Sequence, residues 1–238
     1  MPLPHLITDP AIAASRPSKY LGIFGMIWVT FLIVAMFTAA KTFYLGPANF
    51  SVSILAYPFT YIFADIFTEV YGYRVTRRIV WTGLVCLLLA SSVAYLYSII
   101  PPSPSYTDDA SFKLIFKASP VLAMANILSF FGGELTNSFV LAKMKIRTRG
   151  SMLWMRLIGS TLAGQFVDNS IFFLTVFFVA GIFQSSELVS LILTAVVFCT
   201  TWEAIISPLT HRVIGFLKKK EGLDTFDHGT NFNPFALR

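Results

Sequence analysis

The chain has 238 residues and a formal net charge of +6, yet only 13% of its residues are charged and 55% are hydrophobic. Its mean hydropathy is +0.70. A soluble domain needs a more polar surface than this, so the composition excludes that class and indicates a membrane protein. The basic residues are spread over several short loops and form no single stripe, which argues against nucleic acid as a partner.

Long apolar segments recur along the chain, each near the length of about 20 residues that a helix needs to cross a bilayer. We expect six of them, at residues 20–43, 51–71, 79–100, 120–142, 156–183 and 188–217. Backbone polar groups must be satisfied within the segment in hydrocarbon, so all six are expected to be helices. The sequence therefore predicts an all-α polytopic fold, with a disordered tail at 1–19, a membrane domain at 20–217 and a second tail at 218–238.

Lysine and arginine gather in alternate connections between these segments. The connections on one side carry Arg16, Lys19, Arg74, Arg77, Arg78, Lys143, Lys145, Arg147, Arg149, Arg156, Arg212, Lys218, Lys219 and Lys220. The connections on the other side carry only Lys113 and Lys117. Because basic loops stay in the cytoplasm, we predict that both termini are cytoplasmic. Three spans in each half would then have opposite orientations, which is typical of a 3+3 inverted pseudo-repeat.

Five carboxylates lie inside the predicted spans: Asp65, Glu69, Glu134, Asp168 and Glu203. A carboxylate at the centre of a span costs about 2.5 to 3.5 kcal/mol to insert, so such groups survive mainly where they line a polar cavity. We therefore expect the helices to enclose a hydrophilic site.

The second span carries part of this site. Tyr61, Asp65 and Glu69 recur every four residues and so share one helix face. Pro58 lies just upstream, and its missing N–H predicts a kink that turns a free carbonyl toward the cavity. For Glu69, the alternative to a role in the site is a shallow position at the cytoplasmic edge and an ion pair with Arg74 or Arg77.

The later acids have polar neighbours at helical spacing. We expect Asp65, Glu134 and Asp168 to converge near the bilayer midplane, with Asn137 and Gln165 beside them. Trp202 precedes Glu203 and either covers a ligand ring or packs in the core. The full set of candidate site residues is Tyr61, Asp65, Glu69, Glu134, Asn137, Gln165, Asp168, Asn169, Trp202 and Glu203.

Motifs for catalysis and energy coupling are absent from the sequence. It contains no GxxxxGK[ST], HExxH or GxSxG string and no dense carboxylate–histidine cluster. We therefore predict no enzyme activity, no metal and no cofactor. The function class that is left is transport of a small polar molecule.

Several strings resemble the queuosine precursor transporter family, a branch of the vitamin uptake transporter group. They lie in one register over roughly residues 20 to 235 and comprise Tyr57-Pro58-Phe59-Thr60, Thr68-Glu69-Val70-Tyr71-Gly72, Gly133-Glu134-Leu135-Thr136-Asn137-Ser138, Gly159-Ser160-Thr161, Ser207-Pro208-Leu209-Thr210 and Asn231-Phe232-Asn233-Pro234-Phe235. The chain departs from the family pattern at Gln165, where many relatives have an acid.

The resemblance implies import of 7-cyano-7-deazaguanine and 7-aminomethyl-7-deazaguanine, precursors of a modified tRNA base, across the bacterial inner membrane. A carboxylate matches the paired N–H donors of a deazaguanine, and we expect Asp168 first and Glu134 second in this role, with Tyr61 or Trp202 over the ring. The alternatives are import of queuine or another purine-like compound, and a substrate-capture subunit that needs a separate ATPase. No obligatory ATPase is expected. The sequence leaves open homodimer formation, the preferred precursor and proton coupling.

Overall fold

The structure is a computed structural model that describes residues 9–38, 41–45, 48–116, 120–180 and 185–236. Helices dominate it, and one short β-hairpin connects the first two long helices. In chain order the elements are α1 (Pro10–Ser15), α2 (Leu21–Thr38), β1 (Thr42–Leu45), β2 (Ala48–Ser51), the 3-10 helix η1 (Val52–Leu55), α3 (Tyr57–Tyr71), α4 (Tyr73–Ser98), α5 (Asp109–Phe116), α6 (Pro120–Arg147), α7 (Leu153–Thr175), the π-helix η2 (Val176–Ala180) and α8 (Ser185–Glu221).

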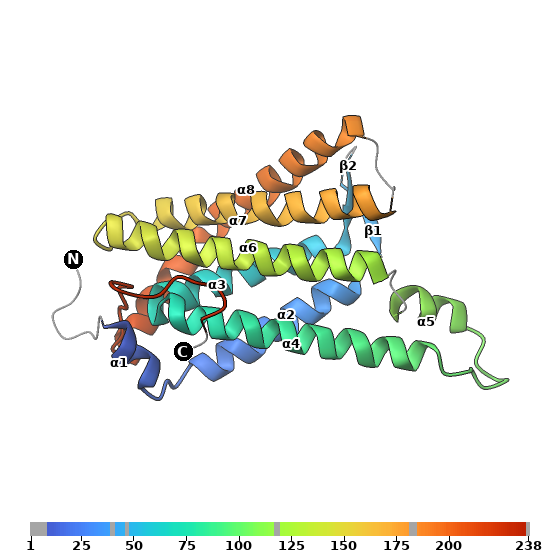
Figure 1. The fold of residues 1–238 in the computed structure, drawn as a ribbon, viewed down its shortest axis with the longest axis horizontal. Coiled ribbons are helices and arrows are strands. Elements are labelled where there is room, and N and C mark those ends of the chain that lie inside the picture. Colours follow the sequence, from blue (N-terminus) through green and yellow to red (C-terminus); the bar gives the residue numbers. More distant parts are fainter. Residues whose placement is uncertain (1–8, 39–40, 46–47, 117–119, 181–184, 237–238) are drawn as a thin grey trace.

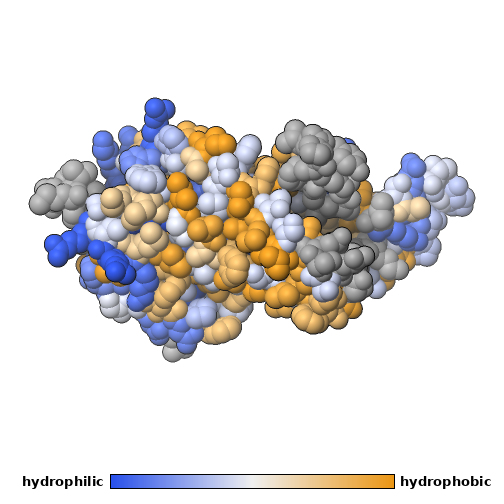
Figure 2. Space-filling model, turned by 90° about the horizontal axis from the view of Figure 1, so that it is seen from above, coloured by the Kyte–Doolittle hydropathy of each residue, from blue (hydrophilic) through white to orange (hydrophobic). Residues whose placement is uncertain are grey.

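Helices α2, α3, α4, α6, α7 and α8 occupy the positions of the predicted spans. Of the described residues, four helical stretches are long and apolar enough to cross a membrane: Leu21–Thr38, Tyr73–Ser98, Leu153–Val179 and Leu188–Glu221. Figure 2 shows hydrophobic residues over the middle of the molecule and hydrophilic residues toward both ends. The predicted helical class is confirmed. The number of spans, six, stays a prediction, because α3 has only 15 residues and polar residues interrupt the apolar sequence of α6.

The second predicted span is not one continuous helix. Residues 48–55 form β2 and η1, and α3 begins only at Tyr57. Pro58 therefore lies in the first turn of α3, where its missing N–H costs nothing because the first amides of a helix have no intrahelical partner. The predicted kink at Pro58 was wrong, and the proline starts a helix here.

The short helix α3 lies at the centre of the molecule and is buried along most of its length. It packs against α2, α4, α6 and α8 (Figure 1). The Trp28 indole of α2 donates a 3.0 Å hydrogen bond to the Thr60 carbonyl and packs against Phe67 of α3. This enclosure holds the polar face of α3 in the interior of the helix bundle.

A chain segment after α8 closes one end of the bundle. Residues 222–236, which we call the C-terminal strap, run beside the α3–α4 connection. Gly72 makes this connection with φ 87°, and a Cβ there would lie 2.6 Å from Thr225 Cγ2, so only glycine fits. The Asp227 carboxylate accepts hydrogen bonds from the Tyr73 amide at the start of α4. Burial raises the pKa of Asp227 above its usual value.

Figure 1 shows α1 and the C-terminal strap at the same end of the bundle, and α5 and the β-hairpin at the opposite end. Neither α5 nor the hairpin was predicted from the sequence. Part of the region predicted as a disordered tail forms α1, with the Asp9 side chain accepting a 2.7 Å hydrogen bond from the Ala11 amide. The side of the membrane that each end faces stays a prediction.

Candidate substrate site

The predicted polar face of α3 points into the bundle. Tyr61, Asp65 and Glu69 are all buried, with at most 1% of each residue exposed. Their four-residue spacing sets the three side chains one above another along the helix. The contacts they make separate them into two groups, a central cluster around Asp65 and a charged network around Glu69.

The Asp168 carboxylate of α7 is held by two tyrosines of α3. Tyr61 Oη donates a 3.0 Å hydrogen bond to Asp168 Oδ2, and Tyr57 Oη donates to the same oxygen. Two hydroxyl donors stabilise a buried carboxylate and fix its orientation. Tyr57 was not among the predicted site residues, although its position four residues before Tyr61 places it on the same helix face.

Asp65 is anchored on one oxygen and unpaired on the other. Asn137 Nδ2 of α6 donates a 2.7 Å hydrogen bond to Asp65 Oδ1. Asp65 Oδ2 and Asn137 Oδ1 are buried and have no hydrogen-bond partner among the described residues. This pair therefore presents two unused acceptors beside the hydrogen bond that links α3 to α6.

Glu134 and Glu203 differ from the other acids because neither oxygen of either side chain has a hydrogen-bond partner among the described residues. Both side chains are buried, with exposures of 0% and 1%. Glu134 lies close enough to interact electrostatically with Asp168 and Glu203, and Asp65 also interacts with Glu203. Thr60 lies beside Glu134, but its hydroxyl donates to the Tyr57 carbonyl at 2.7 Å. Carboxylates from α3, α6, α7 and α8 thus meet in one central carboxylate cluster, which consists of Asp65, Glu134, Asp168 and Glu203.

The remaining predicted residues have different surroundings. Asn169 Nδ2 donates to both the carbonyl and the side-chain oxygen of Gln165, so Asn169 supports Gln165. Gln165 Nε2 and Trp202 Nε1 are buried donors without a partner among the described residues. The structure thus contains unused donors as well as unused acceptors, and the acceptors are more numerous.

Two glycines let the helices of the site approach closely. A Cβ at Gly133 would lie 2.4 Å from Tyr61 Oη and 2.6 Å from Asp168 Cβ. A Cβ at Gly164 would lie 2.8 Å from Asn137 Cβ and 2.9 Å from the Gly133 carbonyl oxygen. These contacts bring α6 and α7 together beside Asp168 and Asn137, as small residues do between membrane helices.

Glu69 belongs to a separate charged network at the end of the bundle near the C-terminal strap. Its carboxylate accepts hydrogen bonds from both terminal nitrogens of Arg156 and lies 2.6 Å from Lys218 Nζ. Lys145 Nζ donates a 2.6 Å bond to the Glu69 carbonyl and lies 2.7 Å from Asp224 Oδ1. The expected ion pair forms, but with these partners and not with Arg74 or Arg77. Three basic side chains already surround the Glu69 carboxylate, so we leave Glu69 out of the proposed site, and its predicted role there stays a prediction.

In the described part of the chain, no group of three or more histidine, cysteine or acidic side chains has an arrangement suited to a metal ion. The ion pairs among the described residues involve only Glu69, Asp109 and Asp224 as acids. The central carboxylate cluster therefore has no basic side chain paired with it in that part of the chain.

Residues 51–213 match the protein family described as "Putative vitamin uptake transporter". The chain belongs to this family. The matched range contains the central carboxylate cluster, Tyr57, Tyr61 and both close-packed glycines. Membership in a transporter family and the several apolar helices together make the chain a multi-pass membrane protein.

A relative from Bacillus subtilis, named "Probable queuosine precursor transporter", is 27% identical over 154 residues, covering 64% of this chain and 66% of the relative. The resemblance drawn from the sequence strings is therefore confirmed at the level of the family and of this relative. No solved structure matches the chain.

Proposed function

We propose that this protein imports queuosine precursors, 7-cyano-7-deazaguanine and 7-aminomethyl-7-deazaguanine, through the bacterial inner membrane. The name of the Bacillus relative and the family match support a transporter of this type. The observation that carries the proposal is Glu134, a fully buried carboxylate whose two oxygens have no hydrogen-bond partner in the described part of the chain. An unpaired buried polar group costs about 1 to 3 kcal/mol, which a ligand donor would recover.

The acceptors of the site suit the donor edge of a deazaguanine. Its ring N–H and exocyclic amine form a donor pair that a carboxylate binds with two oxygens. Glu134 takes this role in our proposal, because Asp168 already accepts from Tyr57 and Tyr61. The order expected from the sequence, Asp168 before Glu134, is therefore reversed. Asp65, Asn137 and Glu203 contribute further unpaired acceptors.

Purified protein in lipid vesicles, with no ATPase present, tests the proposal through uptake of labelled 7-aminomethyl-7-deazaguanine. We expect wild-type protein to accumulate the label and Glu134→Gln to lose at least about tenfold in uptake, since a hydrogen bond to a charged group contributes about 1.5 to 3 kcal/mol. Asp108→Asn, at an exposed position outside the long helices, is the matched control and should transport normally.

Competition defines what the site recognises. Guanine-like compounds should displace the label, and adenine should not, because adenine lacks the paired donors. Equal competition by adenine would contradict the proposed carboxylate contact. If the protein binds the label but takes none into vesicles until an ATPase is added, the chain is a capture subunit instead.

A further inference from the structure

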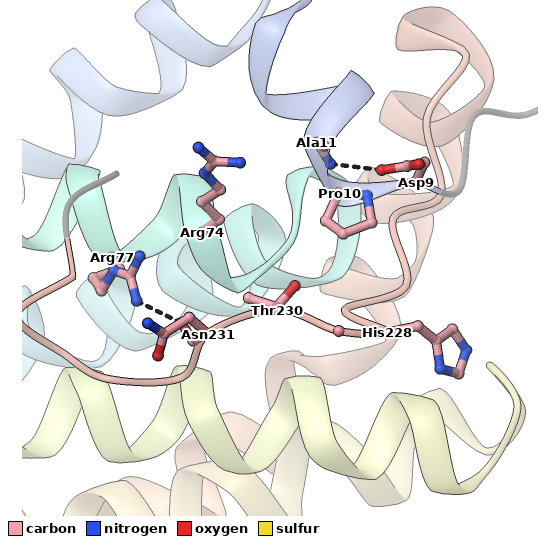
Figure 3. A pocket seen from close by; sticks show the side chains of 9 residues that line it. Asp9, Pro10, Ala11, Arg74, Arg77, His228, Thr230 and Asn231 are labelled. Carbon is pink, nitrogen blue, oxygen red and sulfur yellow. Dashed lines mark hydrogen bonds between the residues drawn. The ribbon is translucent and has the colours of Figure 1, made fainter.

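A polar cavity lies at the end of the bundle that holds α1 and the C-terminal strap (Figure 3). Its volume is about 310 Å³. It lies between the start of α1, the first turns of α4 and the strap, and its charged or ionisable lining residues are Asp9, Arg74, Arg77 and His228. None of these residues belongs to the candidate substrate site.

Two arginines supply the charge of this cavity, which we call the arginine cavity. Arg74 and Arg77 are three residues apart, so they project from neighbouring turns on one side of α4 (Figure 3). Neither forms an ion pair with a carboxylate in the part of the chain that the structure describes. The two positive charges therefore lie together without a direct ion pair, although Asp9 lines the same cavity and Asp227 lies close enough to Arg77 to interact with it electrostatically.

Arg77 is held in place and still has an unused donor. Only 1% of the residue is exposed, and its Nη1 donates to the carbonyls of Asn231 and Asn233 at 2.7 and 2.6 Å. The Nε atoms of Arg77 and Arg74 are both buried without a hydrogen-bond partner among the described residues. A buried arginine N–H without an acceptor is costly, so these donors point to an acceptor that enters from outside the chain.

We propose that the arginine cavity binds a phosphate group. Arginine presents its donors as a rigid fork that matches the oxygens of a phosphate, and two such side chains line this cavity. The first turn of α4 adds the positive end of a helix dipole. Thr230 and Asn231 of the strap line the same cavity, so a bound phosphate would connect α4 to the strap.

The phosphate has two sources with the same chemistry, the headgroup of an anionic phospholipid and a soluble phosphate. Basic pockets at the cytoplasmic ends of membrane helices suit lipid headgroups, and the charge distribution of the sequence predicts that this end is cytoplasmic. Asp9 opposes the anion from the rim of the cavity, where its side chain also caps α1. Removal of the Asp9 charge should therefore strengthen phosphate binding, whereas removal of an arginine should weaken it.

The experiment measures the melting temperature of the full-length protein in nanodiscs. One arm titrates inorganic phosphate against phosphatidylcholine nanodiscs, and the other replaces part of the phosphatidylcholine with phosphatidylglycerol. Stabilisation in the first arm identifies a soluble phosphate, and stabilisation in the second arm alone identifies a lipid headgroup. No stabilisation in either arm overturns the proposal.

Matched variants assign the effect to the cavity. The measured quantity is the concentration of phosphate or lipid that produces half of the shift in melting temperature. Arg74→Gln should raise this concentration at least fivefold. Asp9→Asn removes the opposing charge while keeping a capping side chain, so it should lower that concentration. Arg212→Gln, at an exposed position in α8, should behave as wild type. A half-shift concentration for Arg74→Gln equal to that of the wild type contradicts the assignment, and so does a higher half-shift concentration for Asp9→Asn. If Arg74→Gln fails to fold, Asp9→Asn still tests the proposal.

Discussion

At the scale of single residues, the acids of this chain differ in what already satisfies them. Asp168 has two tyrosine hydroxyls, Asp65 has one amide, and Glu134 has no hydrogen-bond partner in the described part of the chain. A carboxylate with internal donors is stabilised and oriented by them, whereas an unpaired one gains most from a ligand. This difference underlies our choice of Glu134 as the substrate acceptor.

Tyr57 and Tyr61 are predicted to support transport by orienting the Asp168 carboxylate. Tyr57→Phe or Tyr61→Phe removes one donor from Asp168, and the double variant removes both, leaving a buried carboxylate without its hydroxyl partners. We expect each single variant to lose a few-fold in uptake and the double variant at least about tenfold, because each lost bond to a charged group costs about 1.5 to 3 kcal/mol.

Tyr95→Phe, at an exposed position of α4, is the control for removal of a tyrosine hydroxyl. Vesicle uptake and the amount of folded protein are measured together for all the variants. Normal uptake by the double variant would show that the orientation of Asp168 is not required for transport.

At the scale of elements, the site depends on how closely α6 approaches α7. A methyl group at Gly133 would overlap both Tyr61 Oη and Asp168 Cβ, and one at Gly164 would overlap the Gly133 carbonyl oxygen. Neither overlap involves only the end of a flexible side chain. The two helices must therefore separate if either glycine is replaced.

Gly133→Ala and Gly164→Ala are thus predicted to lower the melting temperature and to abolish uptake, since overpacking a closely packed interior costs about 1 to 3 kcal/mol or more. Gly215→Ala provides the control, because a Cβ at Gly215 meets no atom within 4 Å. It should be neutral or slightly stabilising, as alanine favours a helix interior by up to about 1 kcal/mol relative to glycine. Equal melting temperatures for Gly133→Ala and Gly215→Ala would refute the close-packing argument.

The charged network around Glu69 joins four helices and the C-terminal strap. It links α3 to α6, α7, α8 and the strap through Lys145, Arg156, Lys218 and Asp224. Breaking a buried ion pair by removing one partner costs about 3 to 5 kcal/mol, because the other charge is left uncompensated. We infer that this network fixes the end of the bundle near the strap.

A double-mutant cycle tests this role. Glu69→Gln and Arg156→Gln should each lower the melting temperature strongly, and the double variant should lose less than the sum of the two. Additive losses would indicate that the two side chains do not act as a pair. Normal stability of Glu69→Gln combined with lost uptake would return Glu69 to the substrate site.

At the scale of the whole molecule, α1 and the C-terminal strap lie at one end of the bundle, together with the basic α6–α7 connection (Figure 1). Figure 2 shows the apolar surface between two hydrophilic ends. This arrangement accommodates the predicted orientation, in which the basic end is cytoplasmic.

Topology in intact cells follows from this orientation. A tag after residue 238 should be protected from external protease, and a reporter inserted at residues 103–112 should be accessible. A reporter inserted in the α6–α7 connection should be protected, because this connection carries Arg147 and Arg149. An accessible C-terminal tag would overturn the orientation and, with it, the assignment of the arginine cavity to the cytoplasmic side.

The sequence alone determined the helical class, the approximate position of each long helix and the buried face of α3, because hydrophobic length and four-residue spacing are local properties of a chain. It also identified the family through its local strings. It did not determine that Pro58 begins a helix, since a proline in an apolar segment is compatible both with a kink inside a helix and with the first turn of one. Only the tertiary structure decided that Arg156 and Lys218 bind Glu69, that Tyr57 and Tyr61 occupy Asp168, and that Glu134 is left unpaired. Those outcomes depend on which side chains of distant helices meet, and this is set by packing across the bundle and not by spacing along one helix.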